Sequence, residues 1–224
     1  MARHEDRRKA IELRLRGFTY SEIRKELDLS KSTLSGWLTN YHLTKDQLKR
    51  VDKKKELQIE HYRQSCARRR KLIDDEVYNT QKAIWTPLSN RELFLAGLFL
   101  YWGEGTKVGS HIINISNSDP RVIKFALFWL KKCIKIPLNK IRVLVHLYSD
   151  MDIGRELDYW SKTLGIPRTN FTKPYVKSST RAGLTYKSFG HGTCNITYLN
   201  VQVKREIMQT ISAISDFYAN IDII

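Results

Sequence analysis

The chain has 224 residues, of which 39 are lysine or arginine and 23 are aspartate or glutamate, so it carries a net charge of +16 and has a pI near 9.8. The basic excess is shared by residues 1–84 and the remainder, and it favours duplex DNA over a membrane as the partner, because no amphipathic or lipidation signal accompanies it. The start of the chain lacks the apolar stretch of a secretory signal and the three cysteines lack zinc-type spacing, so we expect a cytosolic protein with reduced thiols.

Residues 1–42 have the spacing of a helix-turn-helix domain. Ala10, Ile11 and Leu15 recur at a helical period, and Gly17 follows where that helix would end. Thr19-Tyr20-Ser21-Glu22 is a capping-box pattern, which predicts the start of a second helix.

A tight turn at Asp28-Leu29-Ser30 then leads into a third helix at about residues 31–38. The arrangement resembles the small three-helix modules of transposases and resolvases, whose third helix enters the major groove. This resemblance implies DNA contacts from Lys31, Ser32, Thr33 and Ser35. Their short hydroxyl side chains predict modest sequence discrimination. A three-helix protein-interaction module is the alternative.

Residues 43–86 are expected to form a basic helical linker. The stretch Lys45–Ala83 has no glycine or proline and includes the run Arg68-Arg69-Arg70-Lys71. Its apolar residues recur near helical spacing without a clean heptad, which predicts one or two long helices. These helices would either lie along DNA phosphates or act as a solvated spacer.

The segment Leu93–Gly105 is the most informative of the chain, because an apolar run ends there in one carboxylate, Glu104, between two glycines. The run is too short to span a bilayer and predicts a helix buried on nearly all sides. Ala96 and Gly103 lie two turns apart on one face, where small side chains would let a second backbone approach.

This segment resembles the signature helix of the LAGLIDADG homing endonucleases. Leu100-Tyr101-Trp102-Gly103-Glu104-Gly105 stands where that family has Leu-Ile-Asp-Ala-Asp-Gly, so Glu104 falls on the metal-binding acid, whereas Leu98 and Phe99 replace small residues. The resemblance implies a Mg²⁺-dependent endonuclease, in which Glu104 from each subunit of a homodimer holds metal. It also implies an α+β fold for residues 87–224, with an antiparallel sheet laid across a roughly palindromic duplex.

The rest of this region is predicted to alternate strands and helices. We expect the order strand, helix, strand, helix, strand, strand, helix, at about residues 111–117, 122–134, 141–148, 153–164, 171–177, 192–198 and 201–218. A further short strand is possible near residues 106–110. Ser118-Asp119-Pro120 is a helix start, and capping explains Asp119 better than a role as a second catalytic acid.

Side chains on one side of the predicted strands are polar or basic, and no acid occurs among them. They are Asn114, Ser116, Arg142, His146, Tyr148, Lys173, Tyr175, Lys177, Thr193, Asn195 and Thr197. This face suits contacts to bases and phosphates, with an ordinary solvated sheet face as the alternative. The DNA-contacting residues that we expect beyond the third helix are Arg142, His146, Lys173, Tyr175, Lys177, Arg181, Lys187 and Asn195. Either Lys173 or Lys177 would also stabilise charge at a scissile phosphate, as a catalytic residue beside Glu104.

The sequence contains no phosphate loop, dinucleotide fingerprint or nucleophile elbow, so we expect no small-molecule cofactor, and catalysis would depend on a metal and a carboxylate. Two hypotheses follow: a site-specific endonuclease, or a non-cleaving DNA-binding regulator that retains the endonuclease fold. RNA binding fits less well, because a helix-turn-helix usually reads duplex DNA.

Overall fold

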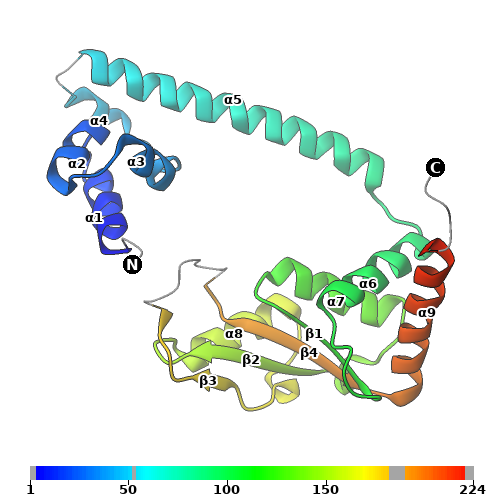
Figure 1. Ribbon diagram of the computed structural model, residues 1–224. Helices are drawn as coiled ribbons and strands as arrows, with labels where there is room; N and C mark the ends of the chain where they lie inside the picture. The colour runs from blue at the N-terminus through cyan, green and yellow to red at the C-terminus, as the bar shows by residue number, and fades with distance from the viewer. Residues whose placement is uncertain (1–3, 52–53, 182–189, 220–224) are drawn as a thin grey trace. The chain divides into compact units, whose positions relative to one another are not determined.

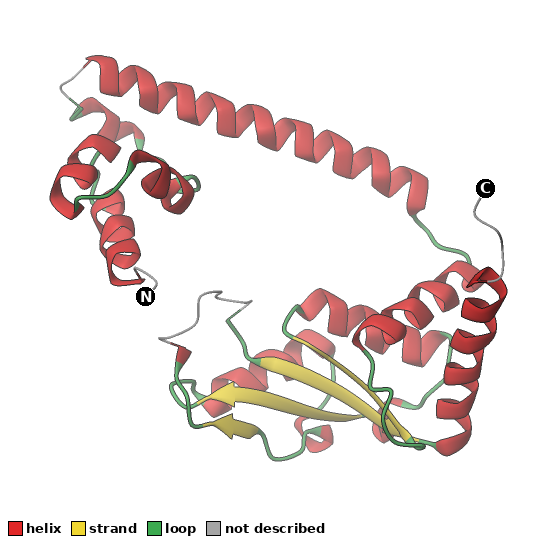
Figure 2. Cartoon of the chain, in the orientation of Figure 1, coloured by secondary structure: helices red, strands yellow, loops and turns green. Residues whose placement is uncertain are grey.

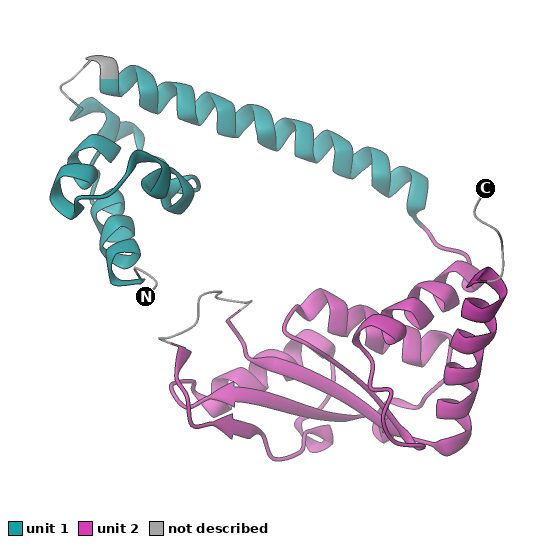
Figure 3. Ribbon diagram, viewed as in Figure 1, with its two compact units in different colours: residues 1–86 teal, residues 87–224 magenta. Residues whose placement is uncertain are grey.

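The computed structural model describes residues 4–51, 54–181 and 190–219. The chain divides into two compact units, residues 1–86 and 87–224 (Figure 3). Each unit has its own cluster of buried apolar residues. In the described ranges, no helix is both long enough and apolar enough to cross a membrane.

The first unit begins with three helices, α1 (His4–Leu15), α2 (Tyr20–Leu27) and α3 (Lys31–Leu38) (Figure 1). Their shared core consists of Ala10, Leu13, Tyr20, Ile23, Leu29, Leu34 and Leu38. The predicted inner stripe of α1 was wrong in part, because Leu15 is 64% exposed. With 3.6 residues per turn, the inward face that starts at Ala10 continues at Leu13 and Arg14 instead.

Local capping confirms the predicted turns of this unit. Gly17 has a φ of 103°, in the left-handed region that glycine adopts without steric cost. The capping box of Thr19 starts α2, and Asp28 ends it with a φ of 45°. The Ser30 hydroxyl accepts a hydrogen bond from a backbone amide in the first turn of α3. These contacts satisfy backbone groups that helix ends leave without partners.

After the short α4 (Lys45–Lys49), one helix of 32 residues, α5 (Lys54–Trp85), completes the unit. The first turns of α5 pack against α1 through a buried ion pair, in which Arg14 Nη2 donates to Glu60 Oε2 at 2.5 Å. Every residue from 68 to 90 is exposed, so the later turns of α5 extend away from this core.

The second unit is built on a sheet of four strands, β1 (Ile112–Asn117), β2 (Arg142–Tyr148), β3 (Tyr175–Lys177) and β4 (Thr193–Leu199). Their order is β1-β4-β2-β3 (Figure 2). β4 pairs antiparallel with β1 and with β2, whereas β3 pairs parallel with β2. The described sheet is therefore mixed, and the prediction of an antiparallel sheet was wrong for β3.

The connection between β2 and β3 explains this difference. α8 (Ile153–Leu164) follows β2 and brings the chain back so that β3 runs in the same direction, which is the crossover that parallel strands need. The approach to β3 is irregular as well. Phe171 bridges to Val143 and packs against the core, whereas Tyr175 is 57% exposed. The proline at position 174 interrupts the strand between them.

The helices of this unit cover one face of the sheet (Figures 1 and 2). They are α6 (Asn90–Glu104), α7 (Pro120–Lys132), α8 and α9 (Val201–Ala219). Inward strand residues such as Ile115, Val145 and Ile196 are fully buried against Trp129 and Trp160 from the helices.

Two features of the helical layer bear on the sequence predictions. The carboxylate of Asp119 accepts from the Arg121 amide and Pro120 opens α7, which confirms the predicted helix start. The expectation that the apolar helix, α6, is buried on nearly all sides was wrong, because Phe99 and Trp102 are 46% and 42% exposed. α6 packs on α7, α9 and β1 with one stripe only, and its other stripe faces solvent.

Candidate nucleic-acid interface

The exposed side of α3 carries most of the residues predicted to contact DNA. Lys31, Ser32 and Ser35 are exposed, while Leu34 on the opposite side is fully buried. Gly36 lies on the exposed side, and a Cβ built there would meet no atom within 4 Å. A helix face with short side chains and a glycine allows its backbone to come close to a partner.

Two of these hydroxyl groups take part in capping the helix. Ser30 Oγ lies 2.9 Å from Ser32 Oγ and 2.7 Å from Thr33 Oγ1, and Thr33 is half-buried. Of the four residues predicted to contact DNA, only Lys31 and Ser35 have side chains that take no part in the cap.

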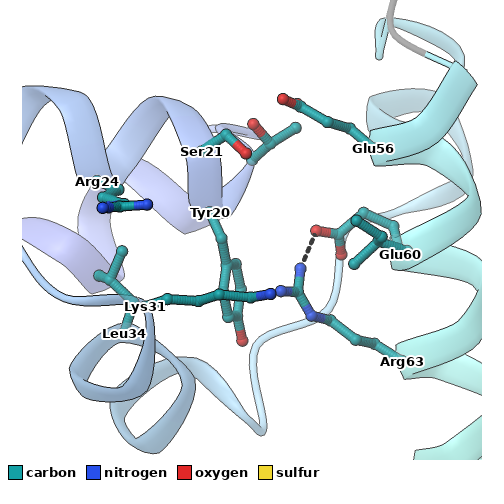
Figure 4. A pocket seen from close by; sticks show the side chains of 10 residues that line it. Tyr20, Ser21, Arg24, Lys31, Leu34, Glu56, Glu60 and Arg63 are labelled. Atoms are coloured by element: carbon teal, nitrogen blue, oxygen red, sulfur yellow. Dashed lines mark hydrogen bonds and ion pairs between the residues drawn. The ribbon is translucent and has the colours of Figure 1, made fainter.

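A pocket beside α3 is lined by Lys31 and by two basic residues that no sequence pattern had indicated, Arg24 and Arg63. It is lined by Tyr20, Arg24, Lys31, Glu60 and Arg63, among others (Figure 4). The guanidinium carbon of Arg63 lies 3.6 Å from the centre of the Tyr20 ring, and Arg63 Nη1 donates to Glu60 Oε1 at 2.7 Å. Burial raises the pKa of the Tyr20 hydroxyl, although nearby Arg63 opposes this. Because Arg63 comes from α5, only the tertiary fold brings it beside α2.

The strand register brings the predicted outward residues to one face of the sheet. Asn114 on β1 pairs with Thr197 on β4, and Thr197 pairs with Arg142 on β2. His146 on β2 pairs with Tyr175 on β3. Paired residues on neighbouring strands point to the same side of a sheet, so these side chains share the face that the helices leave uncovered.

Aromatic and basic groups gather where this face meets the edge strand. The rings of His146 and Tyr175 are 5.3 Å apart in an edge-on arrangement, and Lys177 Nζ lies 4.9 Å from the centre of the Tyr148 ring. Burial lowers the pKa of His146, and the positive charge of Lys177 lowers it further. Both effects favour the neutral imidazole, which can donate or accept a hydrogen bond.

This arrangement predicts the titration of His146. We expect its pKa in the folded protein to lie below 6.5, and we expect Lys177→Met to raise it only part of the way, because burial is the larger cause. Since the folded-state pKa is lowered, protonation opposes folding, and this group contributes stability above its unfolded pKa that is lost as the pH falls. The measurement is NMR of the imidazole resonances. A pKa above 6.5 would contradict the burial of this side chain.

The middle of the face is closed rather than open to a ligand. Asn195, predicted to contact DNA, is 4% exposed, and its side-chain amide donates to the backbone oxygen of Leu144 at 3.1 Å. Asn114 Oδ1 is buried and has no hydrogen-bond partner among the described residues. The groups that a ligand can reach therefore lie toward the ends and the edge of the sheet.

Basic residues border the face at those positions. Arg142 is exposed and donates to a backbone oxygen of the preceding turn at 2.7 Å, and Lys173 is exposed just before β3. Arg181 Nε donates to Asp150 Oδ2 at 2.9 Å, and this contact lowers the pKa of Asp150. An acid thus stands beside a surface that the sequence had indicated as acid-free. Lys187 lies outside the described residues.

Glu104 ends α6 on its solvent-facing side. Gly103 precedes it, where a Cβ would meet nothing within 4 Å, and the backbone of Gly105 bridges to Ile115 of β1. Across the part of the chain that the structure describes, no three His, Cys, Asp or Glu side chains come together as a metal site. Among the described residues, Glu104 is therefore not part of a metal site of three or more such side chains.

The loop after Glu104 is held by a lysine that sequence reasoning missed. Lys204 of α9 is 3% exposed, and its Nζ donates to the Tyr101 hydroxyl at 2.6 Å and to the backbone oxygen of Thr106. Burial lowers the pKa of Lys204 and raises the pKa of Tyr101 to about 12. Lys204 is distant in sequence from both partners, so no local pattern could have indicated this contact.

The first 47 residues of the chain match a known domain family. A family model described as a homeodomain-like domain, of the helix-turn-helix type, matches residues 1–47. This match confirms the helix-turn-helix prediction and indicates DNA binding. Comparisons with curated proteins and with solved structures found no match. The family match ends well before α6, so the LAGLIDADG resemblance remains a prediction.

Proposed function

We propose that this protein binds duplex DNA, with α3 in the major groove and the outward face of the sheet as a second contact surface. The observation that carries the proposal is the helix-turn-helix of residues 1–47 with Lys31 and Ser35 exposed on its third helix. In such domains the N-terminal residues of this helix approach base edges. The net charge of +16 supports the proposal, because phosphate contacts dominate the affinity of DNA-binding proteins.

The two surfaces would contribute differently. Lys31 can donate to guanine or to a phosphate, and Ser35 can contact either kind of base edge, so α3 supplies the sequence preference. On the sheet, Arg142, Lys173 and Lys177 are cations around a closed centre, an arrangement that suits phosphates better than bases. The sheet would therefore add affinity more than specificity.

Lys31→Ala tests the first surface. We expect weaker binding of the full-length protein to duplex DNA and a plot of log affinity against log salt that is shallower by about one if Lys31 contacts a phosphate. Fluorescence anisotropy at several salt concentrations measures both quantities. Lys124→Ala, an exposed lysine on α7, is the control with the same change in charge. Equal effects of the two substitutions would exclude a specific contact from α3.

A second candidate function is cleavage of the bound duplex. It is favoured by Glu104, an exposed carboxylate at the end of α6 beside an open glycine. A carboxylate oxygen is a ligand that Mg²⁺ accepts, and the metal would polarise a scissile phosphate. Because the LAGLIDADG resemblance gives each chain one signature helix, this function would use a homodimer in which two copies of Glu104 come together. Lys173 or Lys177 would then act beside them.

Glu104→Gln separates cleavage from binding. Wild-type protein is incubated with Mg²⁺ and a randomised duplex library, and all new DNA ends are sequenced. Recurrent ends made by the wild type and by Glu206→Gln, an exposed carboxylate control on α9, but lost in Glu104→Gln, are the result expected of an endonuclease. Retention of particular duplexes without new ends would instead identify a non-cleaving regulator.

A further inference from the structure

α5 carries an apolar stripe that its own unit leaves uncovered. Tyr62, Ile73, Val77 and Ile84 are 71%, 52%, 53% and 62% exposed. At 100° per residue these four side chains fall within a sector of about 60° around the helix axis. Helices in proteins owe most of their stability to the packing of such a stripe against another surface. We therefore expect the later turns of α5 to pack against a partner.

The charges beside this stripe are separated along the helix. A basic block, Arg68–Lys71, precedes Ile73, and an acidic block, Asp74–Glu76, follows it. If a second α5 lay parallel and in register, each block would meet its own copy and like charges would face each other. If it lay antiparallel across Ile73, each basic block would face the acidic block of the other helix.

We propose that α5 is a homodimerisation helix, which pairs antiparallel with α5 of a second copy about a two-fold axis at Ile73. Residues equally far from Ile73 on opposite sides then lie level with each other. Ile73 meets the partner's Ile73, and Tyr62 meets the partner's Ile84. Cys66, half-buried on the same stripe, lies opposite the partner's Thr80. The interface is the same patch on both chains, as a closed two-fold pair requires.

One ion pair is specific to this arrangement. Arg69 and Glu76 lie on the same flank of the stripe, four residues before and three residues after Ile73. Arg69 of one copy therefore comes within about 1.5 Å, measured along the axis, of the level of the partner's Glu76, and this happens twice about the two-fold axis. Within a single helix these two residues are two turns apart, about 10.5 Å along the axis, and they are not neighbours. Within one α5 these two residues therefore make no direct neighbour contact, whereas a second copy brings them together.

DNA fits this surface less well than a second copy does. The basic block alone could lie along phosphates, but the acidic block follows within one turn and would be repelled. Phosphates would also leave the side chains of Ile73 and Val77 exposed to water. The pairing of α5 does not depend on the proposed DNA contacts of α3, because the two sets of residues are different.

The first test is the oligomeric state of the full-length protein without DNA, measured by sedimentation equilibrium. We expect a dimer for the wild type. Ile73→Glu places a charge at the centre of the interface and is expected to weaken the dimer at least about tenfold. Tyr78→Glu is the control, because Tyr78 is 64% exposed on the other side of α5. A monomeric wild type, or equal weakening by both substitutions, would overturn the proposal.

A charge exchange tests the register. Arg69→Glu and Glu76→Arg are each expected to weaken the dimer, whereas the double variant restores the ion pair with its sign reversed and recovers the wild-type affinity. Circular dichroism confirms that the helix content of each variant is unchanged. Failure of the double variant to recover would exclude this register.

Crosslinking tests the direction of the two helices. Thr80→Cys is expected to form a disulfide-linked dimer through the native Cys66 of the partner, and adding Cys66→Ser should abolish it. A parallel pair would give the opposite result, because the introduced thiol would then face its own copy and the link would survive Cys66→Ser. DNA binding by a monomeric Ile73→Glu variant would leave the proposed function intact, so failures of the two proposals are distinguishable.

Discussion

Replacing Glu60 with glutamine is expected to lower the unfolding free energy of the first unit by about 3–5 kcal/mol, the usual result of removing one partner from a buried ion pair. The substitution keeps the shape of the side chain and removes only its charge. Arg14 is 1% exposed and would remain as a buried cation whose counter-ion is gone. Its other contacts, donation to the backbone oxygens of Tyr41 and Phe18, provide no negative charge.

The loss of stability should extend across the whole helix-turn-helix, because Glu60 also pairs with Arg63, which lies over the ring of Tyr20. Hydrogen exchange of backbone amides in α1, α2 and α3, measured on the full-length protein, reports the stability of this unit separately from the second. We expect exchange to accelerate in all three helices together. Binding of DNA should weaken in parallel at temperatures where the unit begins to unfold.

Asp46→Asn is the matched control in the same unit. Asp46 pairs with Lys49 at 2.9 Å, but both side chains are more than three-quarters exposed, and surface pairs of this kind contribute about 0–1 kcal/mol. If Glu60→Gln and Asp46→Asn had equally small effects, Arg14 would have to find another partner or water, and the start of α5 would not stabilise the helix-turn-helix.

Features of the fold that depend on neighbouring residues were predictable from the sequence. The caps of α2, α3 and α7 follow from side chains that reach a backbone amide within three positions. The side of the sheet that each β4 residue faces follows from simple alternation. The pair Arg14–Glu60 joins residues that are 46 positions apart, so local patterns could not indicate it. The direction of β3 could not be predicted from local patterns either, because it depends on the path of the chain through α8 between β2 and β3.

In the candidate interface, too, features set by neighbouring residues were predictable and features set by distant residues were not. Exposure of Lys31 and Ser35 could be predicted, because the buried stripe of α3 fixes which side faces outward. The covered state of Asn195 could not, because its position on the polar side of β4 says nothing about the neighbouring strand that shields it and accepts its hydrogen bond. Side-chain type predicts which face a residue occupies, but not how much of it a ligand can reach.

Gly97→Ala is expected to destabilise the second unit by about 3 kcal/mol, at the upper end of the usual cost of overpacking a core. The new methyl group would lie 2.0 Å from Cδ1 of the Trp129 ring, well inside contact distance. Trp129 cannot easily move away, because it is fully buried, stacks with Tyr101 at 6.4 Å and donates from Nε1 to the backbone oxygen of Phe94. Chemical denaturation followed by tryptophan fluorescence measures the change.

Gly103→Ala on the same helix separates the steric cause from the general effect of replacing glycine. A Cβ at Gly103 meets nothing within 4 Å, so alanine should stabilise the folded chain by up to about 1 kcal/mol through its better helix propensity. Equal losses at both positions would show that the contact with Trp129 does not govern Gly97. A gain in stability combined with lost DNA cleavage would have a different meaning: the open face beside Glu104 would then be one that a second copy of α6 approaches closely.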